Sequence, residues 1–417
     1  MNPSRLFTAS RIALVVTAMS FAIRGGAAAS WAAQFQLSNY QVGLIDGTAF
    51  WGFTLAIFIG GPLCDALGMR RILGIAFAGH LAGILLTMFA WNFSSLYAGT
   101  LLFGIANGSV EAACNPLIAT LYSTEKTTKL NHFHVWFPGG IVIGSLVAYL
   151  LTKLGLGWQF QFASMLLPLA AYGFMFSGQA FPQTERVQQG VSAKGMFLAC
   201  LNPWFLVMVA CMLMTASTEF GPEQWIPNIL TNAGVPGLLV LAWITGLMAV
   251  GRQCAGPFVH RLSPFGTLLA SSLLSLIGLY SMSHSSGLVL FAGATIFALG
   301  VCFFWPTMLG YVNENFPKTG SLGLAIMGGA GMLSLKWVLP LIGRYYDKGI
   351  GLRMPAGLTT DVLNAAPAGS PMAQEWSDIQ ARAGLHVLGQ VEILPAALLV
   401  VFLFLLLVRR RHKGSFA

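Results

Sequence analysis

Long apolar runs, each about the length of a bilayer span, are the feature that most constrains the fold of this chain. A membrane-spanning helix needs about 20 mainly apolar residues, and in lipid the backbone must satisfy its own hydrogen bonds. Runs of this kind lie near 10–31, 42–63, 72–92, 95–122, 132–153, 159–181, 199–220, 236–260, 266–283, 286–311, 320–344 and 387–408. The sequence therefore predicts an all-α polytopic membrane protein with 12 transmembrane helices.

Composition excludes a soluble fold. Hydrophobic residues make up 56% of the 417 residues and charged residues only 8%, whereas an ordinary soluble domain is roughly 25% charged. The cysteines at positions 64, 114, 200, 211, 254 and 302 lie in or beside apolar runs and lack metal-ligand spacing. We expect them to be small buried side chains, and we expect neither a metal site nor a cofactor.

Basic residues collect on one side of the predicted helices. Short loops on that side contain Arg70, Arg71, Lys126 and Lys129, and the chain nears its end with "RRRHK", whereas "AAQFQLSNYQ", "NFSS" and "SHSSG" on the other side contain no Lys or Arg. Because cytoplasmic loops are enriched in these residues, we predict that both termini are cytoplasmic. The net charge of +9 is thus interpreted as a topology signal and not as a nucleic-acid-binding surface.

A polar segment divides the runs six and six. We predict an N-terminal six-helix bundle over 1–181, a cytoplasmic linker over 182–198 and a C-terminal six-helix bundle over 199–417, with an extracytoplasmic loop near 348–386. The halves are pseudo-symmetric: "GGPLCDALGMRR" is echoed 195 residues later by "AGPFVHRLSPFG", and "NPLIATLYSTEK" 190 residues later by "WPTMLGYVNENFPK". Duplicated halves are the plan of many transporters.

The stretch "GPLCDALGMRR" (61–71) identifies a family. Gly61 would allow close helix approach, Asp65 at a helix end can pair with loop arginines, and Gly68 permits a tight turn before Arg70 and Arg71. The stretch resembles the loop between helices two and three of the major facilitator superfamily. The resemblance implies that these five residues form a conformational latch between the halves in the outward-facing state.

A narrower resemblance covers the fourth and fifth predicted helices. Glu111, Asn115 and Pro116 form E-x-x-x-N-P, and "KLN" (129–131) follows. This pattern is similar to the fucose:proton symporter branch of sugar transporters, although His134 and Phe137 stand where that branch has polar amides. The resemblance implies that the helix-four glutamate lines the central cavity and takes part in proton coupling and sugar binding.

Glu111 is also a candidate on physical grounds. Helix positions four apart share a face, so Asn107, Glu111 and Asn115 form one polar stripe. An ionisable group inside a membrane helix is by default a functional candidate, and a dehydrated carboxyl favours its protonated form. Glu111 could therefore carry a proton, or it could be a structural residue paired with a buried cation. A neighbouring stripe suits close helix packing: Gly104, Gly108 and Ala112.

Other intramembrane charges need partners: Arg24, Glu219, Arg252 and Lys336. In one interpretation Arg24 or Lys336 pairs with Glu219 as a structural gate. In another, one of these cations faces the cavity and binds an anionic substrate. For Arg252 we favour a structural role between the halves.

The seventh predicted helix ends in "TEFGPEQWIPNIL" (218–230), where Pro222 and Pro227 each remove a backbone donor and kink or break a helix. Freed carbonyls are tolerated where they line a cavity. The polar and aromatic side chains here are predicted to face substrate or to form an extracytoplasmic gate: Gln224, Trp225 and Asn228.

Aromatic and histidine side chains complete the candidates. Trp136 and Trp305 can stack on a sugar or pack in the core, and His134 near a helix entrance can respond to pH. His80 is expected to be a core residue with its hydrogen bonds satisfied.

Together these patterns predict a monomeric secondary transporter that works by alternating access. The solute is expected to be a small polar molecule, with a monosaccharide favoured, and the coupled ion H⁺, with Na⁺ as an alternative. The alternative function is an organic-anion or drug carrier of the same fold. No nucleotide loop, metal spacing or nucleophile constellation indicates an enzyme.

Overall fold

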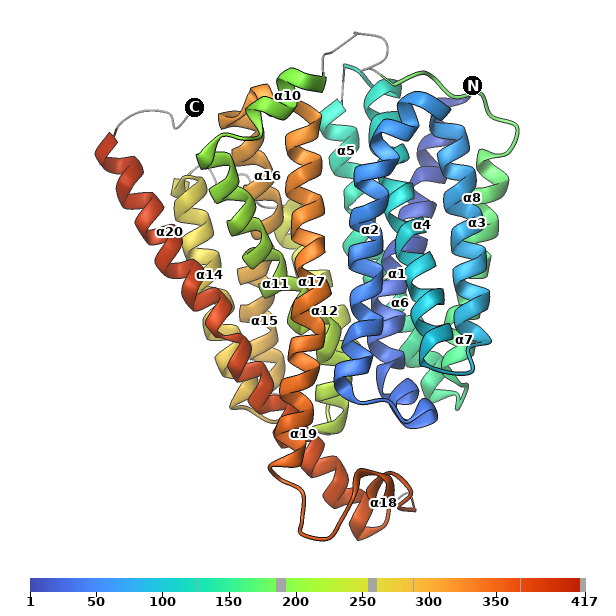
Figure 1. Ribbon diagram of the computed structural model, residues 1–417, viewed down its shortest axis with the longest axis vertical. Helices are drawn as coiled ribbons and strands as arrows, with labels where there is room; N and C mark the ends of the chain where they lie inside the picture. Colours follow the sequence, from blue (N-terminus) through green and yellow to red (C-terminus); the bar gives the residue numbers. More distant parts are fainter. Residues whose placement is uncertain (125, 185–192, 254–260, 288, 368, 413–417) are drawn as a thin grey trace.

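The computed structural model of the chain is built of helices (Figure 1) and describes residues 1–124, 126–184, 193–253, 261–287, 289–367 and 369–412. The first half contains α1 (Pro3–Phe35), α2 (Asn39–Leu67), α3 (Met69–Met88), α4 (Phe93–Leu121), α5 (Lys126–His134), α6 (Trp136–Lys153), α7 (Trp158–Ser164) and α8 (Leu166–Phe176). The second half contains α10 (Ala193–Ala199), α11 (Pro203–Asn232), α12 (Gly237–Gln253), α14 (Pro264–Ser283), α15 (Val289–Val301), α16 (Phe304–Asn315), the 3-10 turn η1 (Pro317–Thr319), α17 (Gly320–Gly351), α18 (Thr360–Asn364), α19 (Pro371–Val391) and α20 (Ile393–His412).

The all-α membrane architecture is confirmed. Within the described residues, 10 helical segments are long and apolar enough to cross a bilayer, and the apolar helix Gly237–Arg252 is shorter. The sixth predicted span is formed by α7 and α8, which are 7 and 11 residues long. The count of twelve spans stays a prediction, because these helices are individually too short to be recognised as spans.

The last span differs from its prediction. The amphipathic stretch of α19 runs directly into α20, and the two form one helical segment over Pro371–Val408. The structure therefore extends the predicted helix at 387–408 toward its N-terminus, so that part of the expected loop is helical.

Local sequence signals explain where the spans begin and turn. Ser38 and Gln41 form a capping box at the start of α2, and Asn92 and Ser95 form one at the start of α4, which satisfies backbone donors at these helix ends. Gly68 stands between α2 and α3 with a φ of +82°, a conformation that favours glycine. The tight turn predicted from "GPLCDALGMRR" is present.

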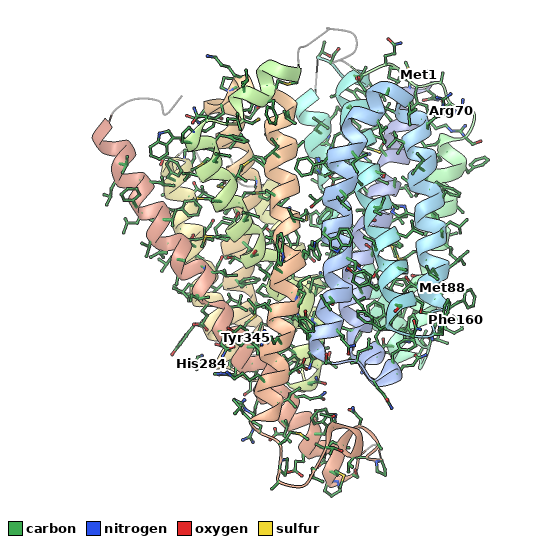
Figure 2. The ribbon with its side chains drawn as sticks, in the orientation of Figure 1. Met1, Arg70, Met88, Phe160, His284 and Tyr345 are labelled. Atoms are coloured by element: carbon green, nitrogen blue, oxygen red, sulfur yellow. The ribbon has the colours of Figure 1, made fainter. Side chains whose placement is uncertain are left out.

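The chain returns to the end of the molecule where it started. Figure 1 shows that α1 begins, and α20 ends, at the end that carries α10, whereas α18 lies at the opposite end. In Figure 2, Met1 and Arg70 share the first end, and Phe160 and His284 lie toward the other. This alternation agrees with the basic loops lying on one side; the assignment of that side to the cytoplasm remains a prediction.

The core consists of two apolar clusters. One draws all its buried members from the first half, between Leu6 and Phe176. The other is built mainly from the second half but includes Phe21, Phe50 and Phe53 of α1 and α2. Apolar packing is therefore continuous between the halves at α1 and α2.

Glycines set the separation of α2 and α4. A methyl group added at Gly104 would meet the backbone of Ala49, and one at Gly108 would meet the backbone of Phe53. The predicted small-residue stripe of α4 is thus confirmed as a close-packing face. The prediction for Gly61 is wrong: no described atom lies within 4 Å of an added methyl group there, and its neighbour Gly60 makes the close approach, to Ala112.

The two halves are joined at the end that carries α18. Gly43 of α2 abuts the backbone of Leu339 and Pro340, and Gly343 of α17 abuts the backbone of Asn39. Asp347 of α17 accepts hydrogen bonds from the backbone N–H groups of Asn39 and Tyr40, each at 2.9 Å, and from the Asn39 side chain at 2.9 Å. A carboxylate from one half thus caps a helix of the other, where the helix dipole favours negative charge.

We expect Asp347→Ala to open this end. Loss of the charged acceptor should weaken the closed arrangement by on the order of 1 kcal/mol, or about a fivefold shift in the equilibrium. Double electron–electron resonance between spin labels on Ala33→Cys and Leu352→Cys should show a larger population of long distances. Asp378→Ala, which removes an exposed ion pair with Arg382, is the matched control. Identical distance distributions in Asp347→Ala and the parent would contradict the capping role.

Candidate functional site

Residues from α4 and α5 form the first part of the site. Glu111 and Asn115 lie one turn apart on α4, both partly accessible, and the Glu111 carboxyl has a hydrogen-bonding interaction with the Asn115 side chain. Nε2 of His134, the last residue of α5, lies 3.1 Å from Oδ1 of Asn115. The structure thus brings these three predicted residues together.

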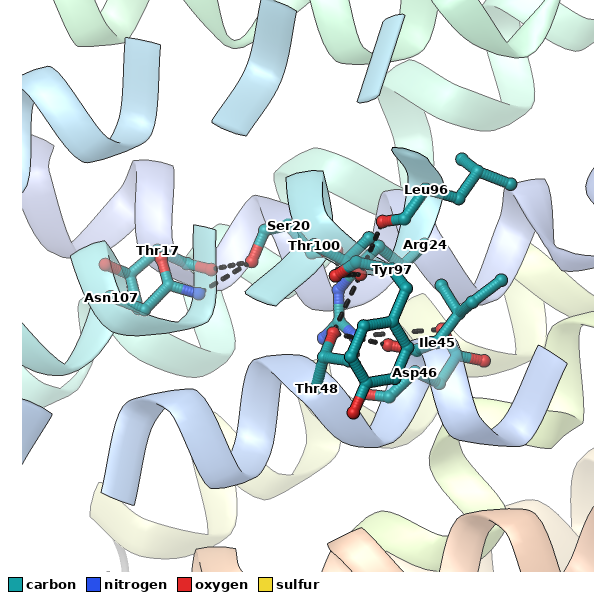
Figure 3. Close-up of polar contacts among 10 residues, drawn as sticks. All are labelled: Thr17, Ser20, Arg24, Ile45, Asp46, Thr48, Leu96, Tyr97, Thr100 and Asn107. Carbon is teal, nitrogen blue, oxygen red and sulfur yellow. Dashed lines mark hydrogen bonds and ion pairs between the residues drawn. The ribbon is translucent and has the colours of Figure 1, made fainter. Parts of the chain in front are cut away.

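Asn107 points elsewhere. Its side chain is buried, with Oδ1 2.8 Å from Nε2 of His80, and its Nδ2 donates to Ser20 Oγ at 3.1 Å (Figure 3). Nδ1 of His80 lies 2.9 Å from the hydroxyl of Tyr172. His80 is the satisfied core residue that was expected. Asn107 links α1, α3, α4 and α8, so we correct its assignment from a cavity-lining residue to a structural one.

Arg24 is fully buried and is held by α2. Its Nη1 donates to the backbone carbonyl of Asp46 at 2.9 Å and lies 3.7 Å from Asp46 Oδ1, and its Nε donates to Ser20 O at 3.1 Å (Figure 3). The guanidinium also lies over the rings of Phe21 and Phe50, a favourable arrangement for a cation. Arg24 therefore does not pair with Glu219.

The carboxylate of Glu219 is paired with Arg252. Nη2 of Arg252 donates to Glu219 Oε1 at 3.0 Å, and its Nε donates to the carbonyl of Cys302 at 3.1 Å. The Arg252 side chain is 24% exposed and that of Glu219 is 2% exposed. The charge of Arg252 also reaches His134 of the first half. The predicted pairing of Glu219 with Arg24 or Lys336 is therefore wrong, because Glu219 pairs with Arg252.

The helix that carries Glu219 is continuous. Both Pro222 and Pro227 lie inside α11, which runs unbroken from Pro203 to Asn232, so the predicted break is absent there. Its second half is buried all round, and the predicted site residues on it have exposures of 3%, 1% and 7%: Gln224, Trp225 and Asn228. Gln224 Oε1 and Trp225 Nε1 are buried and have no hydrogen-bond partner in the described part of the chain.

The remaining candidates have contacts of their own. Lys336 is exposed, with Nζ 5.4 Å from the ring centre of Trp51 and 5.6 Å from that of Trp337. Trp136 is 39% exposed at the start of α6. Trp305 packs edge-on against Phe220, with 6.1 Å between ring centres, which favours the core-packing interpretation.

The predicted latch is described in part. Arg70 and Arg71 are exposed beside the turn at Gly68. The side chain of Asp65 lies outside the described residues, as does that of Asn131 in the helix-five motif. The latch function stays a prediction.

Two buried acids were missed by sequence reasoning: Asp46 and Glu223. Asp46 is 0% exposed, and neither of its carboxyl oxygens has a hydrogen-bond partner among the described residues. Glu223 is 1% exposed, and its Oε1 has no partner in that same part of the chain. The signal that selected Glu111, an ionisable residue inside an apolar run, applies equally to both.

The candidate residues come from both halves. Glu111, Asn115 and His134 belong to the first half, and Arg252, Glu219 and Glu223 to the second. Each group can hydrogen-bond a small polar molecule, and the carboxyls and the histidine can accept or release protons because they exist in two protonation states.

We expect Asp46→Asn to lower stability strongly. It leaves the Arg24 guanidinium buried with only backbone acceptors, which costs about 3 kcal/mol, or on the order of 5 °C in the melting temperature. The double variant Arg24→Gln/Asp46→Asn should melt closer to the parent than the sum of the single variants predicts. Thermal unfolding in detergent measures both. Asp378→Asn, in an exposed pair, should change little; strictly additive losses would argue against a coupled pair.

Comparison with known proteins places the fold in a family. A family model for the Major Facilitator Superfamily matches residues 12–335. The 3-(3-hydroxy-phenyl)propionate transporter of Escherichia coli (strain K12) is 27% identical over 302 residues, 66% of this chain and 71% of that protein. The hexuronate transporter of Bacillus subtilis (strain 168) is 24% identical over 331 residues, 69% of this chain and 75% of that protein.

The fold also resembles a solved structure along its whole length. A bacterial homologue of the human lysosomal transporter Spinster, in an inward-facing and occupied conformation, superposes with a TM-score of 0.79 at 14% identity, covering 97% of each chain. The family model covers well over half of the residues. The chain therefore belongs to the Major Facilitator Superfamily and is a multi-pass integral membrane transporter.

Proposed function

We propose that this protein is a secondary transporter that moves a small carboxylate-bearing solute together with protons, by alternating access between its two halves. The observation that carries the proposal is Arg252, an arginine that is 24% exposed although its partner Glu219 is almost fully buried. This solute class corresponds to the organic-anion carrier that the sequence allows as an alternative, and sugar acids belong to it.

Arg252 has N–H donors that its hydrogen bonds to Cys302 and Glu219 do not use. Nε is used by the carbonyl of Cys302 and Nη2 by Glu219, and a guanidinium has five N–H donors in a planar fork that matches a carboxylate. A solute carboxylate can therefore bind the accessible edge while the ion pair persists. Two relatives of the chain are named for transporting carboxylates, 3-(3-hydroxy-phenyl)propionate and hexuronate, which supports this class.

Glu111 supports the proton part of the proposal. It is partly accessible, interacts with Asn115 and lies on the same face of α4 as the residue that contacts His134. A carboxyl that exchanges between water and an amide neighbour can bind a proton on one side of the membrane and release it on the other.

A matched pair of ligands tests the solute class. D-glucuronate and D-glucose differ in the carboxylate, and we expect a substrate-induced rise in melting temperature for the acid and not for the neutral sugar. 3-(3-Hydroxyphenyl)propionate extends the screen to aromatic acids. Arg252→Gln should abolish the shift, whereas Arg382→Gln, an exposed arginine, should leave it intact. Stabilisation by D-glucose alone would overturn the anion class.

Glu111→Gln tests the coupling. In proteoliposomes with an inward pH gradient, accumulation of the acid that binds should fall to the equilibrium level, because the side chain can no longer exchange a proton. Counterflow exchange of the same acid, which needs no net proton movement, should survive in part. Unchanged accumulation and pH dependence in this variant would show that Glu111 is not part of the coupling mechanism. If accumulation by the parent protein depends on Na⁺ and not on H⁺, the coupled ion is Na⁺.

A neutral monosaccharide is the second candidate solute. It is favoured by the E-x-x-x-N-P pattern of Glu111, Asn115 and Pro116, which resembles the fucose:proton symporter branch. Glu111 and Asn115 together offer acceptors and donors suited to a polyol. The same ligand screen separates this candidate from the anion.

A further inference from the structure

A buried cluster in the second half holds more negative than positive charge. Glu219 and Glu223 lie one turn apart on α11, and Arg252 of α12 pairs with Glu219 at 3.0 Å. Both residues are 1% exposed. Oε1 of Glu223 and Oε2 of Glu219 are buried with no hydrogen-bond partner among the residues that the structure describes. Of the two acids, Glu219 is the one that is hydrogen-bonded to Arg252.

Among the described residues, no second cation acts on Glu223. The charges that act on Glu223 are those of Glu219 and Arg252, and those same two charges act on Cys302 at the end of α15. Several ionisable groups on the helices packed around α11 have contacts elsewhere: Arg24 with Asp46, Lys336 with Trp51 and Trp337, Tyr346 with Asn232, Asp347 with Asn39 and Tyr40, Arg382 with Asp378, and Glu392 with Ser283. Others on α16, α17 and α19 are exposed: Glu314, Arg344, Lys348, Glu375 and His386.

The cluster is least stable when both acids are ionised, because only one of them is then paired with Arg252. Two like charges one turn apart repel each other, and a buried charge is strongly disfavoured unless it is paired. A proton on one of the two acids makes the cluster neutral. Glu219 has the ion pair, so the proton belongs on Glu223.

We propose that Glu223 is a second proton-binding site of this transporter, located in the C-terminal half and separate from Glu111, and that it is protonated whenever Arg252 is paired with Glu219. Release of the proton to water leaves a carboxylate that competes with Glu219 for Arg252. The one guanidinium therefore links the protonation states of the two acids.

The role of this site in transport rests on the proposed function. A solute carboxylate that binds the accessible edge of Arg252 adds another negative charge to the cluster. The cluster then holds its proton more tightly, so anion and proton bind cooperatively. A Glu223 that binds H⁺ would make the transporter carry one proton more than Glu111 accounts for.

Infrared spectroscopy of the purified full-length protein tests the protonation directly, without any solute. At neutral pH the parent should show the C=O stretching band of a protonated buried carboxyl. Glu223→Gln should reduce that band by one carboxyl equivalent. Glu219→Gln should reduce it by the same amount, because Arg252 is then free to pair with Glu223 and ionise it. Glu375→Gln, an exposed acid on α19, is the matched control and should leave the band unchanged.

The outcomes are distinguishable. An undiminished band in Glu223→Gln, or in Glu219→Gln, would overturn the proposal; if Glu223→Gln fails to elute as a monodisperse protein, Glu219→Gln carries the test alone. Loss of the band when choline chloride is replaced by NaCl would assign the site to a metal cation and overturn it too. If the band behaves as expected but no acid is transported, the proposed function fails and the proton site stands.

Discussion

The requirement that a charge buried in a bilayer be neutralised governs the interior of this protein. An ionisable group at the centre of a membrane helix costs about 2.5–3.5 kcal/mol on insertion scales, and the structure answers this cost in different ways. Arg24 is matched by Asp46 and two aromatic rings. Arg252 is matched by Glu219, and His80 by Tyr172 and Asn107. Among the described residues neither Glu111 nor Glu223 has an ion pair, which is why we propose both as proton-binding sites.

Much of the fold could be predicted from the sequence because the signals are local. Apolar runs locate helices, the glycine of "GPLCDALGMRR" locates a turn, and the small residues of α4 locate its packing face. The length of α19 and its fusion to α20 were missed, because hydropathy does not show where an amphipathic helix joins an apolar one. Continuity of α11 through Pro222 and Pro227 was missed because a membrane helix can contain a proline when neighbouring groups satisfy the freed carbonyls, and no local pattern shows those neighbours.

The sequence points to single residues and not to their pairing. Ionisable residues inside apolar runs were selected at Glu111, Glu219 and Arg252, the last for a structural role, whereas Asp46 and Glu223 were missed. Which charge meets which depends on helix rotation and tilt, which no local pattern encodes. Glu219 was therefore assigned to the wrong cation. Asn107 was placed at the cavity with Glu111, but its side chain contacts α1 and α3.

The contact between α2 and α17 has a consequence for how quickly the halves can separate. It is made by main chain against main chain, with Gly43 against Leu339–Pro340 and Gly343 against Asn39. Side chains can relax through many rotamers, so a joint made of them loosens gradually, but two backbones in contact have no such intermediate positions. Packed interfaces of this kind are bistable. We infer that this end of the protein switches between two discrete states, and that the time spent between them is short.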